Sequence, residues 1–170
     1  MNPVELAQHS EHSAYREKLI EHLFVGELLK LSWRLHGCSL EVAKPEVDRS
    51  GYDLIAEANG VVRHIQLKAS IIGGKTACQK IHLKLAEKPS GCVIWIYFDN
   101  DTLCIGPFLF FGAEAGKPLP SLDGYKTATH TKGDKDGFKA ERPNIRALNK
   151  GDFRRFDSIG AIYRVLFEGA

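Results

Sequence analysis

The sequence has 170 residues and a mass of 18.9 kDa, which suits one ordinary domain built around a single core. A hydrophobic share of 44% and a charged share of 26% are those of a globular protein, and they exclude a disordered or fibrous chain. The formal net charge is only +2, but residues 1–60 hold ten acids and six bases, whereas residues 113–170 hold eight acids and eleven bases. The basic second half permits a polyanionic partner, although a solvated lysine surface gives the same count.

Two further absences narrow the class of protein. The longest apolar run, residues 92–98, is far shorter than a membrane-spanning segment, and no apolar leader with a cleavage site is seen, so we expect a cytoplasmic protein outside the membrane. The four cysteines, at positions 38, 78, 92 and 104, include no CxxC pair. We therefore expect reduced, mostly buried thiols in place of a zinc site or a disulfide framework.

Apolar spacing predicts the elements of the first two thirds of the chain. A long helix from about Ser13 to His36 is ended by Gly37, and three strand-like runs follow over residues 39–43, 52–58 and 61–70. The dipeptide Asn59-Gly60 joins the last two runs as a type I′ hairpin turn. The next predicted elements are a helix over Thr76–Lys88 and strands over residues 93–98 and 103–111.

The last third shows a weaker pattern. A long excursion over residues 113–140 contains an expected edge strand from Tyr125 to Thr131, and a final helix starts at Asp157 as its N-cap. The order of elements predicts a single α/β domain over residues 1–170, with a mixed central sheet, a core over residues 13–111 and a C-terminal extension over residues 112–170 that ends in a helix.

The hairpin register brings polar side chains together. With a two-residue turn, the numbers of paired residues sum to 119, so Asp53 lies opposite Gln66. Strand alternation then places Asp53, His64, Gln66 and Lys68 on one face of the sheet. A solvated sheet face with outward polar residues would give the same alternation.

The long helix carries one acid in an unusual position. Glu27 is spaced from Ile20, Leu23, Phe24 and Leu31 so that it lies within the apolar stripe. An ionised carboxylate buried there requires a cation, either a basic side chain or a metal ion. An internal salt bridge or a position at the edge of the stripe would also explain it.

Glu27, Gly51-Tyr52-Asp53 and Gln66-Leu67-Lys68 together resemble the motifs of the PD-(D/E)XK nuclease superfamily. The predicted element order over residues 13–111 is also similar to the αβββαβ core of that superfamily, the restriction-endonuclease-like fold. The resemblance implies that Asp53 is the central ligand of a divalent metal, that Glu27 is the helical carboxylate, and that Lys68 orients or activates the attacking water. It also implies that the backbone carbonyl of Leu67 supplies one more oxygen.

The sequence departs from the family pattern at two positions. Tyr52 stands where the family has proline, which is not a ligand, and Gln66 replaces the usual acid of the last motif. The Gln66 amide oxygen can still ligate a hard cation, but one negative charge is lost, so metal affinity should fall. Asp48, in the same loop as Asp53, is the acid that would compensate as a substitute ligand.

These residues predict a nuclease that uses Mg²⁺ or Mn²⁺ to hydrolyse the phosphodiester bonds of DNA, because hard oxygen ligands suit such ions. The alternatives are a nuclease-fold module that binds nucleic acid or a partner protein without cutting, and a nuclease directed at RNA. Cleavage of both strands of a duplex would fit a homodimer. The bases expected to contact phosphates are Lys75, Lys80, Lys84, Arg154 and Arg155.

Overall fold

The long helix and the hairpin form where the sequence predicts them. The structure, a computed structural model, describes residues 12–47, 49–130, 135, 137 and 139–168. Its first elements are helix α2 (Ser13–Leu35) and strands β1 (Glu41–Ala43), β2 (Leu54–Ala58) and β3 (Val61–Ile71). Asn59 and Gly60 have φ values of 53° and 75°, as a type I′ turn requires. The ladder pairs Ala58 with Val61 and continues in the register that sums to 119, which confirms the predicted hairpin.

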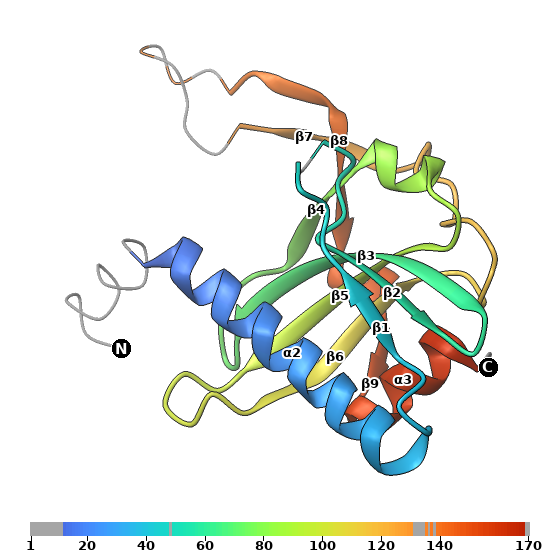
Figure 1. Cartoon of the computed structure of the whole chain (residues 1–170). Helices are drawn as coiled ribbons and strands as arrows, with labels where there is room; N and C mark the ends of the chain where they lie inside the picture. Colours follow the sequence, from blue (N-terminus) through green and yellow to red (C-terminus); the bar gives the residue numbers. More distant parts are fainter. Residues whose placement is uncertain (1–11, 48, 131–134, 136, 138, 169–170) are drawn as a thin grey trace.

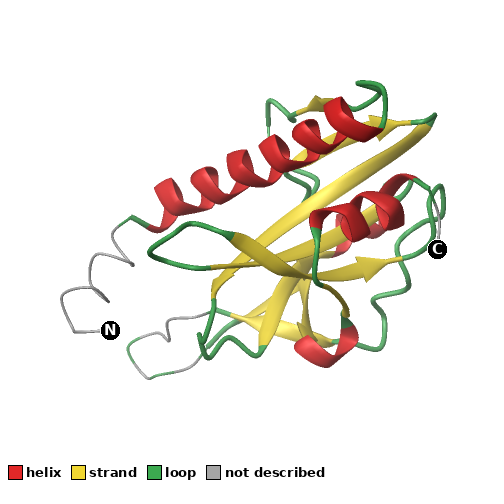
Figure 2. Ribbon diagram, turned by 90° about the horizontal axis from the view of Figure 1, so that it is seen from below, coloured by secondary structure: helices red, strands yellow, loops and turns green. Residues whose placement is uncertain are grey.

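The main sheet is mixed, as expected. Its strand order is β1-β2-β3-β5-β6-β9, and the strands not yet introduced are β5 (Gly91–Phe98), β6 (Ile105–Gly112) and β9 (Arg154–Phe156). Strands β3 and β5 are parallel, and the other neighbouring pairs are antiparallel. Helix α2 and the last helix, α3 (Ile159–Phe167), cover the same face of this sheet (Figure 2).

The prediction of a helix over Thr76–Lys88 is wrong. This stretch forms strand β4 (Cys78–His82) and a short 3₁₀ helix, η1 (Leu83–Glu87). Strand β4 pairs with β8 (Glu141–Asn149), which also pairs with β7 (Lys126–Thr129), so that a second, three-stranded sheet is formed. The αβββαβ order expected from the resemblance is therefore not observed, because a distant strand supplies a ladder that outweighs the local helical spacing.

The C-terminal extension builds both sheets. Strand β7 lies within the predicted edge strand, and β7 and β8 form a ribbon that extends away from the body of the molecule (Figure 1). A single 3₁₀ turn, η2 (Lys150–Asp152), leads from β8 to β9. The final helix is confirmed, but its N-cap is Ser158, whose Oγ accepts a hydrogen bond from the Ala161 N–H, and not Asp157.

Two apolar cores lie on opposite faces of the main sheet. One is formed against α2 and α3 and the other against β4, β8 and η1. All eight residues of β5 are buried; Ile94 points into the first core and Trp95 into the second. Trp95 and Tyr97 are thus core residues.

A buried arginine joins strand β3 to the end of α3. The Arg63 side chain is fully buried, and its Nε and Nη2 donate hydrogen bonds to the carbonyls of Leu166 (2.8 Å) and Val165 (3.0 Å). Both Nη atoms also lie 3.3 Å from the Ala113 carbonyl. The guanidinium therefore satisfies carbonyls that the last turn of a helix leaves without intrahelical partners, and its charge faces the negative end of the helix dipole.

The cysteines are free thiols, as expected, but most are not buried. Only Cys92 is buried, and burial raises the pKa of its thiol to about 12. Cys38, Cys78 and Cys104 are exposed, which contradicts the expectation of mostly buried thiols. Among the described residues, no helix is both long and apolar enough to span a bilayer.

Candidate functional site

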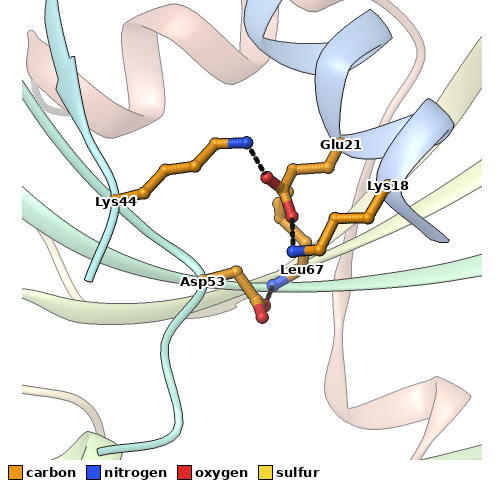
Figure 3. Close-up of polar contacts among 5 residues, drawn as sticks. All are labelled: Lys18, Glu21, Lys44, Asp53 and Leu67. Atoms are coloured by element: carbon orange, nitrogen blue, oxygen red, sulfur yellow. Dashed lines mark hydrogen bonds and ion pairs between the residues drawn. The ribbon is translucent and has the colours of Figure 1, made fainter. Parts of the chain in front are cut away.

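Asp53 lies where the β2–β3 ladder ends. Its backbone N–H donates to the Ile65 carbonyl at 2.8 Å, and its Oδ2 accepts a 2.6 Å hydrogen bond from the Leu67 N–H (Figure 3). Strand β3 continues beyond the last pair with β2, so the Leu67 N–H would otherwise lack that partner. The Asp53 carboxylate is therefore held against the backbone of β3 at a fixed position.

The electrostatic surroundings of Asp53 favour a cation. Burial raises the pKa of Asp53; the Leu67 hydrogen bond and the charge of Lys68 oppose this effect, and the negative charges of Glu17 and Glu21 add to it. The net result is a pKa above the ordinary aspartate value. The ionised Asp53 carboxylate is thus destabilised in the folded protein, because the nearby positive charge and hydrogen bond do not balance the effect of burial. A bound cation would stabilise the ionised form.

The helical acid near Asp53 is Glu21. Its side chain is only 3% exposed and forms ion pairs with Lys18 Nζ, at 2.8 Å from Oε2, and with Lys44 Nζ (Figure 3). Burial raises the pKa of Glu21, but hydrogen bonds from both lysines outweigh burial and leave the pKa below its ordinary value. Lys18 in turn has a raised pKa, chiefly because of its hydrogen bond to Glu21.

Glu27 does not turn into the core, so this expectation is wrong. Its side chain is 39% exposed and pairs with Lys30 Nζ at 2.7 Å. The buried residues of α2 include Ile20, Glu21, Phe24 and Leu28, whereas Leu23 and Leu31 are only half-buried. The buried face is therefore rotated away from the side that holds Glu27, and Glu21 lies on it.

Gln66 is a buried amide with an unsatisfied oxygen. The residue is 8% exposed, and its Oε1 has no hydrogen-bond partner among the described residues. An unpaired buried acceptor costs about 1–3 kcal/mol, and an amide oxygen is a ligand that hard cations accept. The confirmed hairpin register, extended by one pair, sets Gln66 opposite Asp53.

Lys68 opens onto a small cleft between the start of α2 and β4. The cleft has a volume of about 190 Å³, and its lining residues are Ser13, Arg16, Glu17, Leu67, Lys68, Ala69 and Gln79. Gln79 lies on β4, paired with Leu148. Asp53, Gln66 and Lys68 thus come from the region where the β2–β3 ladder ends, and the cleft beside Lys68 is lined by groups of both charges.

Some predicted residues lie elsewhere. Lys75 and Lys84 are exposed, and Lys80 Nζ donates to the Thr129 carbonyl at 2.8 Å, so these lysines do not line one helix. Arg154 and Arg155 are on β9, at the sheet edge opposite β1. Arg154 lies over the rings of two phenylalanines, and Arg155 pairs with the adjacent acid at position 157. Asp48 lies outside the described residues.

His64 has structural contacts. Its Nδ1 is 2.8 Å from the Pro89 carbonyl, and its ring packs edge-on against Tyr52, with 5.0 Å between centroids. These contacts link the β2–β3 hairpin to the loop before β5. These contacts explain the position of the His64 side chain without a role in binding.

The described residues contain no cluster of three or more histidine, cysteine, aspartate or glutamate side chains arranged to hold a metal ion. The oxygen donors near Asp53 are instead one carboxylate, one amide and a helical carboxylate that two lysines neutralise. No protein-family model matches this chain, and no curated protein matches it either. The site is therefore interpreted from its own chemistry.

Proposed function

We propose that this protein is a metal-dependent nuclease that hydrolyses phosphodiester bonds of DNA. The observation that carries the proposal is that the hairpin register, extended by one pair, sets Asp53, an acid whose pKa is raised by burial, opposite Gln66, whose Oε1 is unsatisfied, with the cation Lys68 two residues further along β3. Two oxygen atoms that the fold leaves short of positive charge or hydrogen bonds are what a hard divalent cation would stabilise.

Asp53 and Gln66 would hold Mg²⁺ or Mn²⁺, and Glu21 would support the site from α2 in place of Glu27. When bound, such an ion polarises the phosphoryl oxygen and lowers the pKa of a water molecule. Lys68 supplies a positive charge beside Asp53, where it would hold the scissile phosphate. The Leu67 N–H fixes Asp53, so the backbone of β3 orients the acid and Lys68 relative to each other.

Metal binding and cleavage together test this proposal. We expect Mn²⁺ to bind wild-type protein in a calorimetric titration and to activate cleavage of a panel of labelled single-stranded, duplex and branched DNA and RNA. Asp53→Ala and Lys68→Ala should lower cleavage at least about 100-fold, and Asp53→Ala should also abolish Mn²⁺ binding. Glu27→Ala is the matched control on α2 and should retain both activities, whereas Glu21→Ala should reduce them.

Unchanged cleavage by Asp53→Ala, purified in parallel with the wild type, would show that the assignment is wrong. Cleavage confined to the RNA members of the panel would show that the substrate class is wrong while leaving the site intact.

The ion pairs of Glu21 favour a second candidate, a nuclease-fold module that binds nucleic acid without cutting. Lys18 and Lys44 already neutralise Glu21, so the helical acid does not need a metal for charge balance. This module would bind no Mn²⁺ and cut nothing, yet it would bind duplex DNA with an affinity that falls steeply with salt. Each phosphate contact contributes about −0.9 to the log–log slope, so a salt-independent affinity would favour a protein partner instead.

A further inference from the structure

The outward face of α2 carries an apolar stripe that the nuclease proposal does not use. Six residues, spaced alternately by four and three positions, form what we call the outer seam: Tyr15, Leu19, His22, Gly26, Leu29 and Trp33. This spacing is the heptad pattern of a helix that packs against another helix. The buried residues of α2, among them Ile20 and Phe24, project from the opposite side of the helix.

The outer seam is unusually exposed for its composition. Trp33 is 77% exposed, Tyr15 is 74% exposed and Leu29 is 45% exposed. In Figure 1, α2 lies across the sheet, and no other described helix or strand covers its outer side. Single exposed apolar residues are ordinary on a protein surface, but a continuous stripe with two aromatic residues marks an interaction surface.

We propose that the outer seam binds the outer seam of a second copy of this chain as an antiparallel helix pair. A two-fold axis through the centre of the seam pairs residues whose numbers sum to 48. Tyr15 then lies opposite the partner's Trp33, Leu19 opposite the partner's Leu29, and His22 opposite the partner's Gly26. Side chains of similar size thus oppose each other at the outer positions, and the larger His22 faces Gly26 at the centre.

Gly26 is the position that makes this match specific. A Cβ atom added at Gly26 would meet nothing within 4 Å, so space is open above the helix backbone there. In the antiparallel pair, the imidazole of the partner's His22 would fill that space. A parallel pair would set Gly26 against the partner's Gly26 and His22 against the partner's His22, which leaves a gap at the first position and crowds the second, one helical turn away.

The area of the seam is sufficient for a dimer of modest affinity. An aromatic side chain has about 150–250 Å² to bury, so Tyr15 and Trp33 together expose on the order of 300 Å² in each copy. With the two leucines and His22, a symmetric interface would reach at most about 1,000 Å² in total, which is the lower limit for a specific interface. We therefore expect a dissociation constant in the micromolar range.

The charges beside the seam decide between a second copy and other occupants. Arg16, Lys18, Lys30 and Arg34 flank the seam and would approach the partner's bases, but Lys18 is paired with Glu21 and Lys30 with Glu27. Because these ion pairs lower the repulsion, the size match of the seam favours a second copy. An anionic lipid surface, which would use the same bases, becomes an outcome of the test.

Sedimentation equilibrium from about 1 to 500 µM tests the dimer. We expect the mass to rise from 18.9 kDa toward twice that value, and Trp33→Glu to weaken the association at least 10-fold. Ile72→Glu is the matched control, because Ile72 is 49% exposed but lies off the seam. At about 1 µM, where we expect the wild type to be mostly monomeric, both variants should retain its thermal unfolding midpoint, since neither side chain is in a core.

A single 18.9 kDa species over the whole concentration range would overturn the proposal, as would equal weakening by the two variants. Binding of the wild type to anionic vesicles without self-association would also overturn it and would assign the seam to a lipid surface.

Disulfide trapping tests the antiparallel register. The exposed thiols are first removed by Cys38→Ser, Cys78→Ser and Cys104→Ser, and cysteines are then introduced by Leu19→Cys and Leu29→Cys. We expect the protein with both new cysteines to form a covalent dimer under mild oxidation and the protein with Leu29→Cys alone to form little. Equally fast trapping by Leu29→Cys alone would show a parallel pair and overturn the proposed register.

Discussion

The buried Arg63 provides the sharpest test of how the C-terminal helix is held to the sheet. Replacing Arg63 by methionine keeps much of the side-chain volume but removes every donor. The carbonyls of Ala113, Val165 and Leu166 then lose the guanidinium that contacts them. A buried acceptor left without its partner costs about 1–3 kcal/mol. We expect Arg63→Met to lower the free energy of unfolding by about 3–5 kcal/mol, a large part of the roughly 5–15 kcal/mol available to a domain.

Urea denaturation followed by circular dichroism measures this loss. Arg63→Lys should recover about half of it, because an ammonium can reach one or two of the carbonyls but lacks the planar fork that reaches all three. Arg155→Met is the matched control: the Arg155 side chain is 60% exposed and pairs with an exposed acid, so the loss should stay below about 0.5 kcal/mol. A loss below 1 kcal/mol for Arg63→Met, or an equal loss for both methionine variants, would refute the role of Arg63 in holding α3 to the sheet.

Four further substitutions test the environment of the site and of the hairpin. In urea titrations at pH 7, Glu21→Gln should lower the free energy of unfolding by about 1–2 kcal/mol. Because the folded pKa of Glu21 is lowered, this difference from the wild type should persist above about pH 4.5 and disappear as the pH falls through the folded pKa. Asp53→Asn should stabilise by on the order of 0.5–1 kcal/mol at pH 7, because the folded pKa of Asp53 is raised and its ionised form costs stability; the gain should vanish as the pH falls through the folded pKa toward 3.8. Gly51→Ala should lower the free energy of unfolding by at least about 2 kcal/mol, because φ is +72° and the added Cβ would lie 2.5 Å from His82 Cβ. Gly60→Ala, with a φ of +75° and open space around the residue, should lower it by about 1 kcal/mol.

Each of these expectations has a result that would contradict it. A constant gap between Glu21→Gln and wild type from pH 7 to pH 3 would mean that the ion pairs do not stabilise the fold. A destabilised Asp53→Asn would mean that the ionised carboxylate is satisfied in the folded state. Equal losses for the two glycine variants would mean that strand β4 moves away from Gly51 at little cost.

Local sequence signals predicted the parts of the fold that depend on near neighbours. The turn Asn59-Gly60 determines the register of the hairpin, because two positive φ angles allow only one pairing of the flanking strands. That register alone sets Asp53 opposite Gln66, without any contact to a distant part of the chain. Helix α2 is likewise determined by its own apolar spacing and ends next to Gly37.

Distant contacts explain what the sequence did not predict. Ile81 and Leu85 are fully buried, as a helix over Thr76–Lys88 would also require, but the ladder with β8 comes from residues some sixty positions later. No local pattern identifies that partner. Glu21 was missed for a related reason: the leucines of α2 extend around much of the helix, and only the packed sheet decides which of them is buried.

The buried strand β5 has a consequence for cooperativity. Its even-numbered side chains pack in the first core and its odd-numbered side chains in the second, so residues 92–98 contribute to both cores. Loss of either core would expose one face of β5 to water, and the other core would lose its support at the same time. The two sheets should therefore melt in one calorimetric transition, and the amides of Ile94 and Trp95 should exchange with solvent only through global unfolding.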